Sequence, residues 1–495
     1  MKAIRVRNLR SFANDENQPF VELKPLTIFI GQNSCGKSSL LRTLPLFRQS
    51  IEERTSGPIL WYGTYVDFGM FHQAKNKNTN EDVIYFDFKL DNDDYEDIII
   101  KLGVTVHKNH TKFLNLSIDI GNNNLLFKFS DIGKSKYILN GEEQGENLRY
   151  FLSDNSFIPI LFSRSNPETL DSLLFEDFCD YLYPFYAIYN DSDDNVDIDE
   201  FYSDVQTVLE SNTITSPDKL IESLNEELNL YYENTKNITK NDSEYLFRLY
   251  LKSSGQNILS ACNKLLLKEF RGIRYIAPLR ATAERYYRFQ DFHINELDHT
   301  GSNLAMLLRS FSTRQAKHFQ DWTFEHFGFR VYIKEEGLHY EIMVEIDGSP
   351  NNISDMGFGF SQILPIVTSL WAEQSNVLKK NMFPSLRSNA NKTFVIEQPE
   401  LHLHPELQAK LASVFLKVVT EVKRRQQTRT KIIFETHSKT MIDAIGDEIE
   451  KKPELREMVN IVIFNKEYDE TNVRSVRFDE YGDLIDWPIG FFSGR

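Results

Sequence analysis

Residues 20–44 read FVELKPLTIFIGQNSCGKSSLLRTL. Residues 20–30 form an apolar run typical of a β-strand, and after the loop the apolar spacing changes to that of a helix. The loop residues Gly31 to Ser38 match the pattern G-x-x-x-x-G-K-[ST]. A strand, a loop and a helix in this order are the context in which that pattern binds phosphate. The stretch therefore predicts an α/β fold with a nucleotide site at the end of this strand.

The residue types in the loop suit this chemistry. Glycine at positions 31 and 36 lets the backbone curl, so that N–H groups and the helix N-terminus face the phosphates. Lys37 neutralises the β- and γ-phosphates, and Ser38 offers a hydroxyl to Mg²⁺. The alternative, a chance glycine turn before a structural helix, is disfavoured because motif and context agree. The predicted nucleotide-binding residues are Gly31, Asn33, Ser34, Gly36, Lys37, Ser38 and Ser39.

Elements predicted outward from this loop alternate between strands and helices. A short strand is expected at residues 3–8, and alternating runs between about 83 and 140 predict an antiparallel β lobe. Between about 141 and 270 the apolar spacing is helical, which predicts a helical insertion. Strand signals return later, with helices between the last three, which favours a largely parallel sheet. These signals lie at residues 329–346, 393–397, 431–435 and 460–464.

Composition excludes several classes of protein. The 495 residues are 41% hydrophobic and 26% charged, and no apolar run approaches the ~18 residues of a membrane-spanning helix. The N-terminal residues lack the apolar segment of a signal peptide. Cys35, Cys179 and Cys262 lack the spacing of a metal site or a disulfide framework, which favours a reducing compartment. We therefore expect a cytoplasmic protein without a membrane partner.

The net charge of −16 comes from one segment. Residues 171–233 hold 17 Asp and Glu and only one Lys, whereas acidic and basic residues balance in the rest of the chain. This acidic stretch is either a solvated insertion or a dock for a basic partner. A DNA-facing surface elsewhere is compatible with this distribution. Its candidates are Arg271, Arg274, Arg280, Arg285 and Arg288 with Tyr286 and Tyr287, and a second cluster of Lys423, Arg424, Arg425, Arg429 and Lys431.

A second motif, TFVIEQPELHLHP at residues 393–405, is an apolar strand that ends in carboxylates. A carboxylate there holds Mg²⁺, and a further acidic group can polarise the attacking water. His402 and His404 beside a glutamate raise the alternative of a zinc site. Their i, i+2 spacing lacks the i, i+4 geometry of helical zinc ligands, which disfavours zinc.

Two further motifs each have a structural and a functional interpretation. In KIIFETHS, residues 431–438, His437 follows an apolar strand and is either a γ-phosphate sensor or a surface histidine. SDMGFGFSQILP, residues 354–365, is a Ser/Gly-rich turn before an apolar helix, which is either a second anion-binding helix N-terminus or simply a loop.

Together, and in this order, the four motifs resemble those of ABC-type ATPases of the RecF, SMC and OLD-nuclease branch. The resemblance is strongest to stand-alone ATPases of bacterial antiphage systems, including Septu (PtuA-like), which carry IEQPELHLHP and ETHS motifs. It implies an α/β ABC-type ATPase head with a mixed or parallel sheet and an antiparallel β lobe, interrupted by a helical insertion. The expected segments are 1–140 (Walker A lobe), 141–270 (acidic insertion) and 271–495 (C-terminal lobe).

The resemblance also implies roles for individual residues. Glu397 is the Walker B carboxylate, which with Ser38 binds Mg²⁺, and His437 is the switch histidine. The signature loop, which meets ATP across a dimer of heads, contains Ser354, Gly357, Gly359 and Ser361, and either serine is a candidate for phosphate contact.

One position departs from the family pattern. Gln398 stands where the family has its catalytic glutamate, and an amide cannot accept a proton. Hydrolysis is therefore expected to be slow, unless Glu400 takes over as the base.

The resemblance predicts an ATP-sensing subunit of an antiphage complex, oligomeric through its ATPase heads. The 58 residues after His437 are too few for a fused Toprim nuclease, so we expect a separately encoded nuclease, for instance of HNH type, acting on DNA. A DNA-repair ATPase of the RecF/SMC kind and a transporter ATPase subunit are the alternatives. The insertion lacks sustained heptads, which disfavours the former, and the HLHP and ETHS segments disfavour the latter.

Overall fold

The computed structural model places the chain in two compact units, which we describe separately. Unit 1 contains Met1–Glu16, Gln49–Tyr62 and Phe68–Lys268, and unit 2 contains Asn17–Arg48, Gly63–Asp67 and Glu269–Arg495. The predicted division into 1–140, 141–270 and 271–495 is not tested by these units and stays a prediction. The residues that the structure describes are 1–53, 55, 57–91, 97–130, 133–153, 156–162, 170–188, 198–212, 214–234, 236–253, 255–288, 294, 296–337, 339–375, 392–420 and 430–487.

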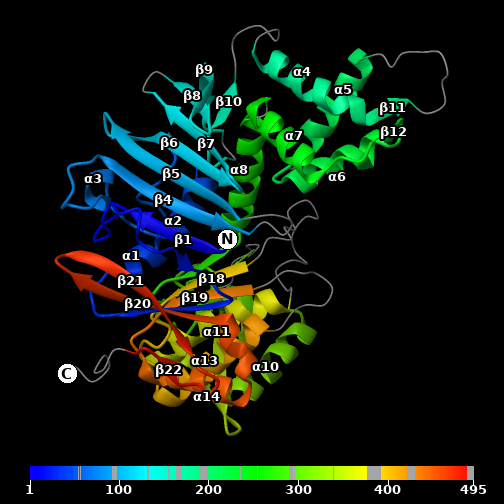
Figure 1. The fold of residues 1–495 in the computed structure, drawn as a ribbon. Coiled ribbons are helices and arrows are strands. Elements are labelled where there is room, and N and C mark those ends of the chain that lie inside the picture. Colours follow the sequence, from blue (N-terminus) through cyan, green and yellow to red (C-terminus); the bar gives the residue numbers. More distant parts are fainter. Residues whose placement is uncertain are drawn as a thin grey trace. The chain divides into compact units, whose positions relative to one another are not determined.

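Unit 1 is built around an antiparallel sheet, which we call the β lobe (Figure 1). Its strand order is β10-β9-β8-β7-β6-β5-β4-β1. The antiparallel β lobe predicted from residue 83 is therefore confirmed, but it continues past residue 140, where helices were expected. The strands are β1 (Ala3–Arg7), β4 (Val83–Leu90), β5 (Ile98–His107), β6 (His110–Ile120), β7 (Asn123–Phe129), β8 (Lys134–Leu139), β9 (Glu142–Phe151) and β10 (Ile160–Phe162).

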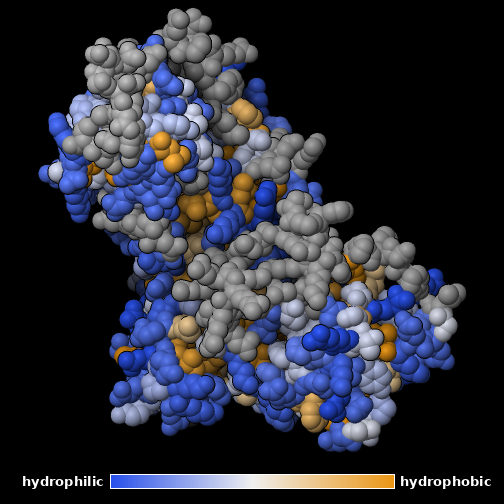
Figure 2. Space-filling view, turned by 90° about the vertical axis from the view of Figure 1, so that its right-hand side faces the viewer, coloured by the Kyte–Doolittle hydropathy of each residue, from blue (hydrophilic) through white to orange (hydrophobic). Residues whose placement is uncertain are grey.

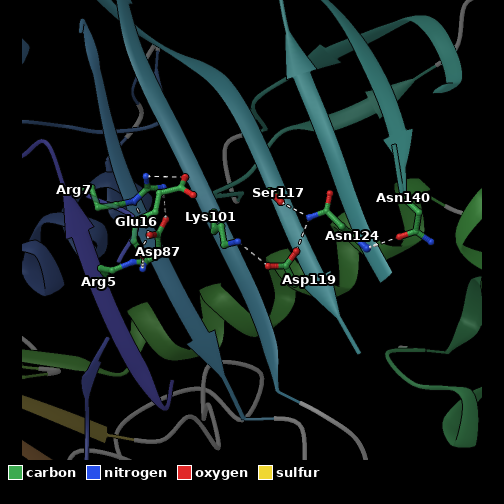
Figure 3. Close-up of polar contacts among 9 residues, drawn as sticks. All are labelled: Arg5, Arg7, Glu16, Asp87, Lys101, Ser117, Asp119, Asn124 and Asn140. Atoms are coloured by element: carbon green, nitrogen blue, oxygen red, sulfur yellow. Dashed lines mark hydrogen bonds and ion pairs between the residues drawn. The ribbon is translucent and has the colours of Figure 1, made fainter. Parts of the chain in front are cut away.

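The two faces of the β lobe differ because side chains alternate along each strand. In β4, Ile84, Phe86 and Phe88 are fully buried on one face. On the other face Asp87 lies between Arg5 and Arg7 of β1, and both guanidinium groups bind its Oδ2, at 2.8 and 3.0 Å (Figure 3). Farther along this face Lys101 pairs with Asp119 at 2.9 Å, and Asn124 binds Asp119 in turn.

The expected helical insertion is present from α4 onward and packs on itself. Helices α4 and α7 contact each other, and Tyr181 of α4 donates a hydrogen bond to Asp242 of α7 at 2.8 Å. The prediction of helices after the β lobe is therefore confirmed, with a start near residue 170. Unit 1 also contains α3 (Phe71–Ala74), α4 (Leu170–Leu182), β11 (Tyr186–Ile188), α5 (Ile198–Ser211), α6 (Pro217–Leu228), β12 (Tyr232–Asn234), α7 (Lys240–Ser253) and most of α8 (Gly255–Arg271).

Unit 2 contains the predicted parallel sheet, with strand order β13-β18-β19-β3-β20-β21-β22. Strands β13, β18, β19, β3 and β20 run parallel, and β21 and β22 add antiparallel pairs. All six residues of β3 are buried, as expected for a strand with both faces covered. The strands of this sheet are β3 (Leu26–Gly31), β13 (Ile273–Ile276), β18 (Lys392–Glu397), β19 (Thr430–Glu435), β20 (Val459–Glu467), β21 (Glu470–Phe478) and β22 (Leu484–Ile485), and unit 2 also contains β2 (Val21–Glu22), outside this sheet.

Helices α11, α13 and α14 lie against this sheet (Figure 1). Alternate strand residues such as Ile28, Ile396 and Phe434 share one hydrophobic core with Leu364, Leu411 and Ile445 from these helices. A β14-β16-β15 sheet with β17 at its edge completes the unit. The remaining elements are α1 (Lys37–Leu41), α2 (Thr43–Glu52), β14 (Tyr287–Arg288), α9 (Leu304–Arg309), α10 (Thr313–Phe327), β15 (Arg330–Glu336), β16 (His339–Ile346), β17 (Ser349–Asn352), α11 (Phe358–Gln374), α13 (Pro405–Thr420) and α14 (Lys439–Lys451).

The fold-class prediction, a mixed α/β protein with a parallel sheet, an antiparallel β lobe and a helical insertion, is confirmed. Hydrophilic side chains cover most of the coloured surface in Figure 2, and hydrophobic ones form separate patches. Within the described ranges, no helix has the length and apolar character needed to cross a membrane.

Candidate functional site

The predicted phosphate loop joins β3 to α1 in unit 2. A Cβ at Gly31 would lie 2.5 Å from both Cys35 Sγ and the Phe464 carbonyl oxygen, so only glycine fits at this position. Gly36 directly precedes α1 with a φ of 98°, a conformation that favours glycine. Both glycines of the motif therefore have a structural reason, and the strand–loop–helix context is present as expected.

Lys37 is only 5% exposed and points back over this loop. Its Nζ donates hydrogen bonds to the carbonyl oxygens of Gly31, at 2.9 Å, and Gln32, at 2.7 Å. Among the described residues no carboxylate forms an ion pair with Lys37, so its charge is available to a phosphate. Asn33 and Ser34 are exposed on the loop, and Ser39 is half-buried in α1.

Glu397 ends β18 and is 1% exposed, and both of its carboxylate oxygens already have donors. Arg42 binds them bidentately, with Nε to Oε1 and Nη2 to Oε2 at 2.7 Å each. The Tyr275 hydroxyl also donates to Oε1, at 2.6 Å. The hydrogen bond to Glu397 raises the pKa of Arg42, and burial followed by the charge of Glu397 raises that of Tyr275. Sequence analysis missed Arg42 and Tyr275, because neither belongs to a recognisable motif.

Glu435 is the second buried carboxylate of the site, and sequence analysis missed it as well. It ends β19 directly opposite Glu397 in the parallel register and is 2% exposed. The Ser38 hydroxyl donates to its Oε2 at 2.7 Å. Burial, followed by the charge of Glu397, raises the pKa of Glu435 to about 7. The available signal was that KIIFE, like TFVIE, is an apolar strand ending in a carboxylate.

Gln398, Glu400 and His437 lie beside these strand ends. The Gln398 N–H donates to the Glu435 carbonyl oxygen at 3.1 Å, and the backbone at Gln398 has a φ of 42°. Glu400 Oε1 accepts the His437 backbone N–H at 2.7 Å, and burial raises the pKa of Glu400. In the described part of the chain, Glu400 Oε2 is buried without a hydrogen-bond partner. The His437 side chain is exposed, and partial burial and then the charge of Lys37 lower its pKa.

Arg280 belongs to this site and not to a DNA-facing surface. It is 4% exposed, and its Nη2 donates to the carbonyl oxygens of Glu397, at 2.9 Å, and Gln398, at 3.5 Å. Its Nε and Nη1 are buried without a partner among the described residues. Burial lowers the pKa of Arg280 to about 10, so the side chain stays charged at neutral pH. Its assignment to a DNA track is wrong because this side chain is enclosed.

The other basic candidates fall into two groups. Arg274 forms intramolecular ion pairs with Glu373, at 3.1 Å, and Glu296, at 3.3 Å. Arg285 is exposed, although it pairs with Asp355, and Arg271, Tyr286 and Arg288 are exposed as well. The cluster Lys423, Arg424, Arg425 and Arg429 lies outside the described residues.

The signature residues surround the start of α11. Ser354 is exposed and its hydroxyl binds Asn352 Oδ1 at 2.9 Å, whereas Ser361 is buried in the helix. Gly357 has a φ of 78° and precedes the helix, and a Cβ at Gly359 would lie 3.0 Å from the His402 carbonyl oxygen. Within the described residues, no hydrogen bond joins these four positions to the phosphate loop.

His402 and His404 have structural contacts. The His402 ring packs edge-on against Phe358, with centroids 4.9 Å apart, and His404 Nδ1 accepts the Glu406 N–H at 3.3 Å. No group of three or more His, Cys, Asp or Glu side chains within the described ranges could hold a metal ion.

A Mg²⁺ ion fits the donors beside Ser38. A hydroxyl and one or two carboxylates are hard oxygen ligands, and Mg²⁺ in nucleotide sites takes few protein ligands besides phosphates and waters. Ser38, Glu435 and Glu397 provide such oxygen atoms at the ends of α1, β19 and β18.

One comparison with known proteins identifies the family of this chain. No curated protein matches the chain significantly. Three solved structures, each 10% identical, show low similarity: the Smc head bound to the C-winged helix domain of ScpA (96% of this chain, 97% of that chain, TM-score 0.35), the Smc head with a coiled coil and joint from Pyrococcus yayanosii (96%, 96%, 0.36) and the recombination mediator RecF-ATPrS (95%, 97%, 0.29). A family model described as AAA ATPase domain matches residues 1–442, nearly the whole chain. The chain therefore belongs to this family of ATPase domains.

Proposed function

We propose that this ATPase is the nucleotide-sensing subunit of an antiphage defence system and that it controls a separately encoded nuclease acting on DNA. The observation that carries the sensing role is Gln398, an amide at the strand end where the catalytic base is expected. An amide cannot take the proton of the attacking water, so bound ATP persists and acts as a signal. The defence role rests on the resemblance of the motifs at 393–405 and 431–438 to those of Septu-type ATPases.

Bound nucleotide would be held mainly by Lys37 and the loop backbone. Among the described residues, the partners of the Lys37 Nζ are two carbonyl oxygens and the Cys35 Sγ, at 4.0 Å, so the β- and γ-phosphates would supply its countercharge. Mg²⁺ would be held by Ser38 with Glu397 or Glu435, and it would neutralise charge on the phosphates. His437, exposed beside Lys37, would contact the γ-phosphate.

Glu400 is the residual base in this proposal. Its Oε1 is oriented by the His437 N–H, and Oε2 is unpartnered among the described residues, so this atom can accept a proton from water. Burial raises its pKa, which makes it a better base than a solvent-exposed glutamate. Slow turnover through Glu400 would reset the sensor.

Head closure would transmit the nucleotide state. Two copies would meet through ATP, with the signature loop of one copy at the nucleotide of the other, and Ser354 is the better candidate for phosphate contact because Ser361 is buried. A nuclease that binds only the open or only the closed state of the heads would be held or released as the ATP concentration varies. The shift between these two states cannot exceed the difference in the affinity of ATP for them. The acidic stretch at 171–233 would dock a basic partner, Arg285 and Arg288 would face DNA, and the complex would be cytoplasmic.

The test is reconstitution of the chain with the nuclease encoded beside it. Lys37→Ala should weaken ATP binding by about 100-fold or more in calorimetry, since a charged phosphate contact is lost. The same variant should uncouple DNA cleavage by the nuclease from ATP. Lys439→Ala is the matched control, because this exposed lysine pairs with Asp443 on α14 and, within the described ranges, with no other carboxylate.

Three outcomes would contradict the proposal. One is metal-dependent DNA cleavage by the purified chain alone. Another is a nuclease whose activity and binding ignore both ATP and Lys37→Ala. The third is ATP-dependent DNA bridging by the chain without any nuclease, which would favour the DNA-repair ATPase instead.

A further inference from the structure

The hydroxyl of Ser38 identifies where the metal of a phosphate loop would lie, because this hydroxyl is the loop's own metal ligand. In this structure its partner is Glu435, at 2.7 Å, and not the expected Walker B residue Glu397. The two carboxylates end neighbouring parallel strands at the same register position, so both could reach the site. Their surroundings decide which one is available to a cation.

Glu397 is already satisfied by charged and polar donors. Arg42 occupies both of its oxygens at 2.7 Å, and Tyr275 adds a third hydrogen bond at 2.6 Å. A metal at Glu397 would have to displace a bidentate guanidinium, which is among the strongest partners of a carboxylate. Its backbone carbonyl is bound by Arg280 as well, which further fixes this strand end.

Glu435 is not paired in this way, although the charges of Lys37 and Arg42 act on it. Among the described residues, no Lys or Arg forms an ion pair with it, although it is 2% exposed. Burying a carboxylate without a paired cation is costly, and the cost disappears when a cation binds. The single hydrogen bond from Ser38 occupies Oε2 and leaves further lone pairs of the carboxylate available.

We propose that Glu435, and not Glu397, is the carboxylate that binds Mg²⁺ beside Ser38, and that Glu397 with Arg42 and Tyr275 is a fixed support of this strand end. The inference rests on the proposed Mg²⁺–ATP site. It assigns a metal-binding role to Glu435, which lies inside the KIIFETHS motif but received no role from the sequence.

Glu435→Gln and Glu397→Gln form a matched pair of isosteric substitutions for the test. Mn²⁺ binding in the presence of ATP is followed by electron paramagnetic resonance, and ATP affinity is measured with Mg²⁺ and with EDTA. Glu435→Gln should weaken Mn²⁺ binding by about 10- to 100-fold, the usual range for losing such a group, and should remove the gain in ATP affinity from Mg²⁺. Glu397→Gln should keep both within about 3-fold of wild type.

Glu435→Asp keeps the charge but has a shorter side chain, so it should recover only part of the metal affinity that Glu435→Gln loses. Circular dichroism shows whether each variant folds. If Glu435→Gln does not fold, the test rests on Glu435→Asp. Unchanged Mn²⁺ binding in that variant contradicts the proposal, and weakened binding supports it. Loss of metal in Glu397→Gln, with or without loss in Glu435→Gln, overturns the proposal. If only the assignment of Glu435 is wrong, the protein still binds ATP in EDTA. If the proposed nucleotide site is wrong, Lys37→Ala has the same ATP affinity as wild type.

Discussion

The β lobe and the nucleotide site both bury charged side chains, but they partner them differently. In the β lobe Asp87 is 0% exposed and two guanidinium groups, those of Arg5 and Arg7, bind it (Figure 3). In unit 2 the described residues give Glu435 no ion pair and leave Arg280 Nε and Nη1 and Glu400 Oε2 without partners. The buried charge of Asp87 in the β lobe is neutralised, whereas the nucleotide site contains several buried polar groups that have no partner among the described residues.

This difference distinguishes buried polar groups that stabilise the fold from buried polar groups that serve binding or catalysis. An unpartnered buried donor or acceptor costs about 1–3 kcal/mol, so a folded protein tolerates few of them. Those that persist together in one place mark a site that water, nucleotide or metal completes. We therefore expect substitutions in the β lobe to change mainly the free energy of unfolding, and substitutions at the strand ends of unit 2 to change mainly binding and turnover.

The largest effect is expected for Asp87→Asn. Removing this charge takes from Arg5 and Arg7 the buried carboxylate that they share, although Glu16 still pairs with Arg7, and should lower the free energy of unfolding by about 3–5 kcal/mol. Urea unfolding and amide hydrogen exchange of β1 and β4 measure the loss. Asp119→Asn, at a partly exposed pair with Lys101, is the control and should cost about 1 kcal/mol or less. Unchanged exchange in Asp87→Asn would mean that this network is not structural.

Glu400→Gln and Gln398→Glu test the nucleotide site, where some buried polar groups lack partners among the described residues. If Glu400 is the base, Glu400→Gln should reduce ATP turnover by about 100-fold with little change in stability, because one proton acceptor is lost. Gln398→Glu should then raise turnover, since a carboxylate returns to the expected position. Single-turnover assays with Mg²⁺–ATP measure both. Rapid wild-type turnover abolished by Glu400→Gln would identify Glu400 as a full catalytic base and contradict the slow-sensor role.

The sequence predicted the elements whose burial is a local property. Strands β3, β18, β19 and β20 are apolar runs covered on both faces, so their periodicity marked them correctly. Strand β9 was missed because EEQGENLRYF is largely polar and gains its strand conformation from pairing with β8. Propensity alone does not mark a strand of this kind.

The sequence predicted only those residues of the candidate site that lie within one short motif. Gly31, Lys37 and Ser38 lie within one loop, but the partners of the two carboxylates come from distant segments. Arg42 reaches Glu397 across 355 positions, and Ser38 reaches Glu435 across 397. These contacts depend on the strand order β13-β18-β19-β3, which the sequence pattern does not specify. Arg280 was misassigned for the same reason, because local charge says nothing of burial.

Arg280→Met should have a smaller effect, and this effect should appear in ATP turnover more than in the free energy of unfolding. Methionine has a similar length, and losing the desolvation cost of the guanidinium offsets its hydrogen bonds, so stability should change by about 1 kcal/mol or less. Turnover should fall by about 10-fold, because the turn at Gln398 loses its anchor and Glu400 loses a nearby positive charge. Arg48→Met is the control: this arginine has a complete set of partners, Glu296 and the Ile273 carbonyl oxygen, so its loss should lower stability more than turnover. The reverse result for the two arginines would contradict the comparison.

The smallest effect is expected for Tyr275→Phe, with Tyr137→Phe in the β lobe as its counterpart. Tyr137 donates to the Leu251 carbonyl oxygen at 2.5 Å, and Tyr275 donates to Glu397 at 2.6 Å, so each variant loses one buried hydrogen bond. Each should lower the free energy of unfolding by about 1 kcal/mol, because Arg42 continues to neutralise Glu397 in the second case. Urea unfolding compares the two, and calorimetry with Mg²⁺–ATP should find the affinity of Tyr275→Phe within about 2-fold of wild type, which is below about 0.4 kcal/mol. If Tyr275→Phe instead weakened Mg²⁺–ATP by 10-fold or more, Glu397 would be part of the metal site, and the contrast between a fixed Glu397 and an available Glu435 would fail.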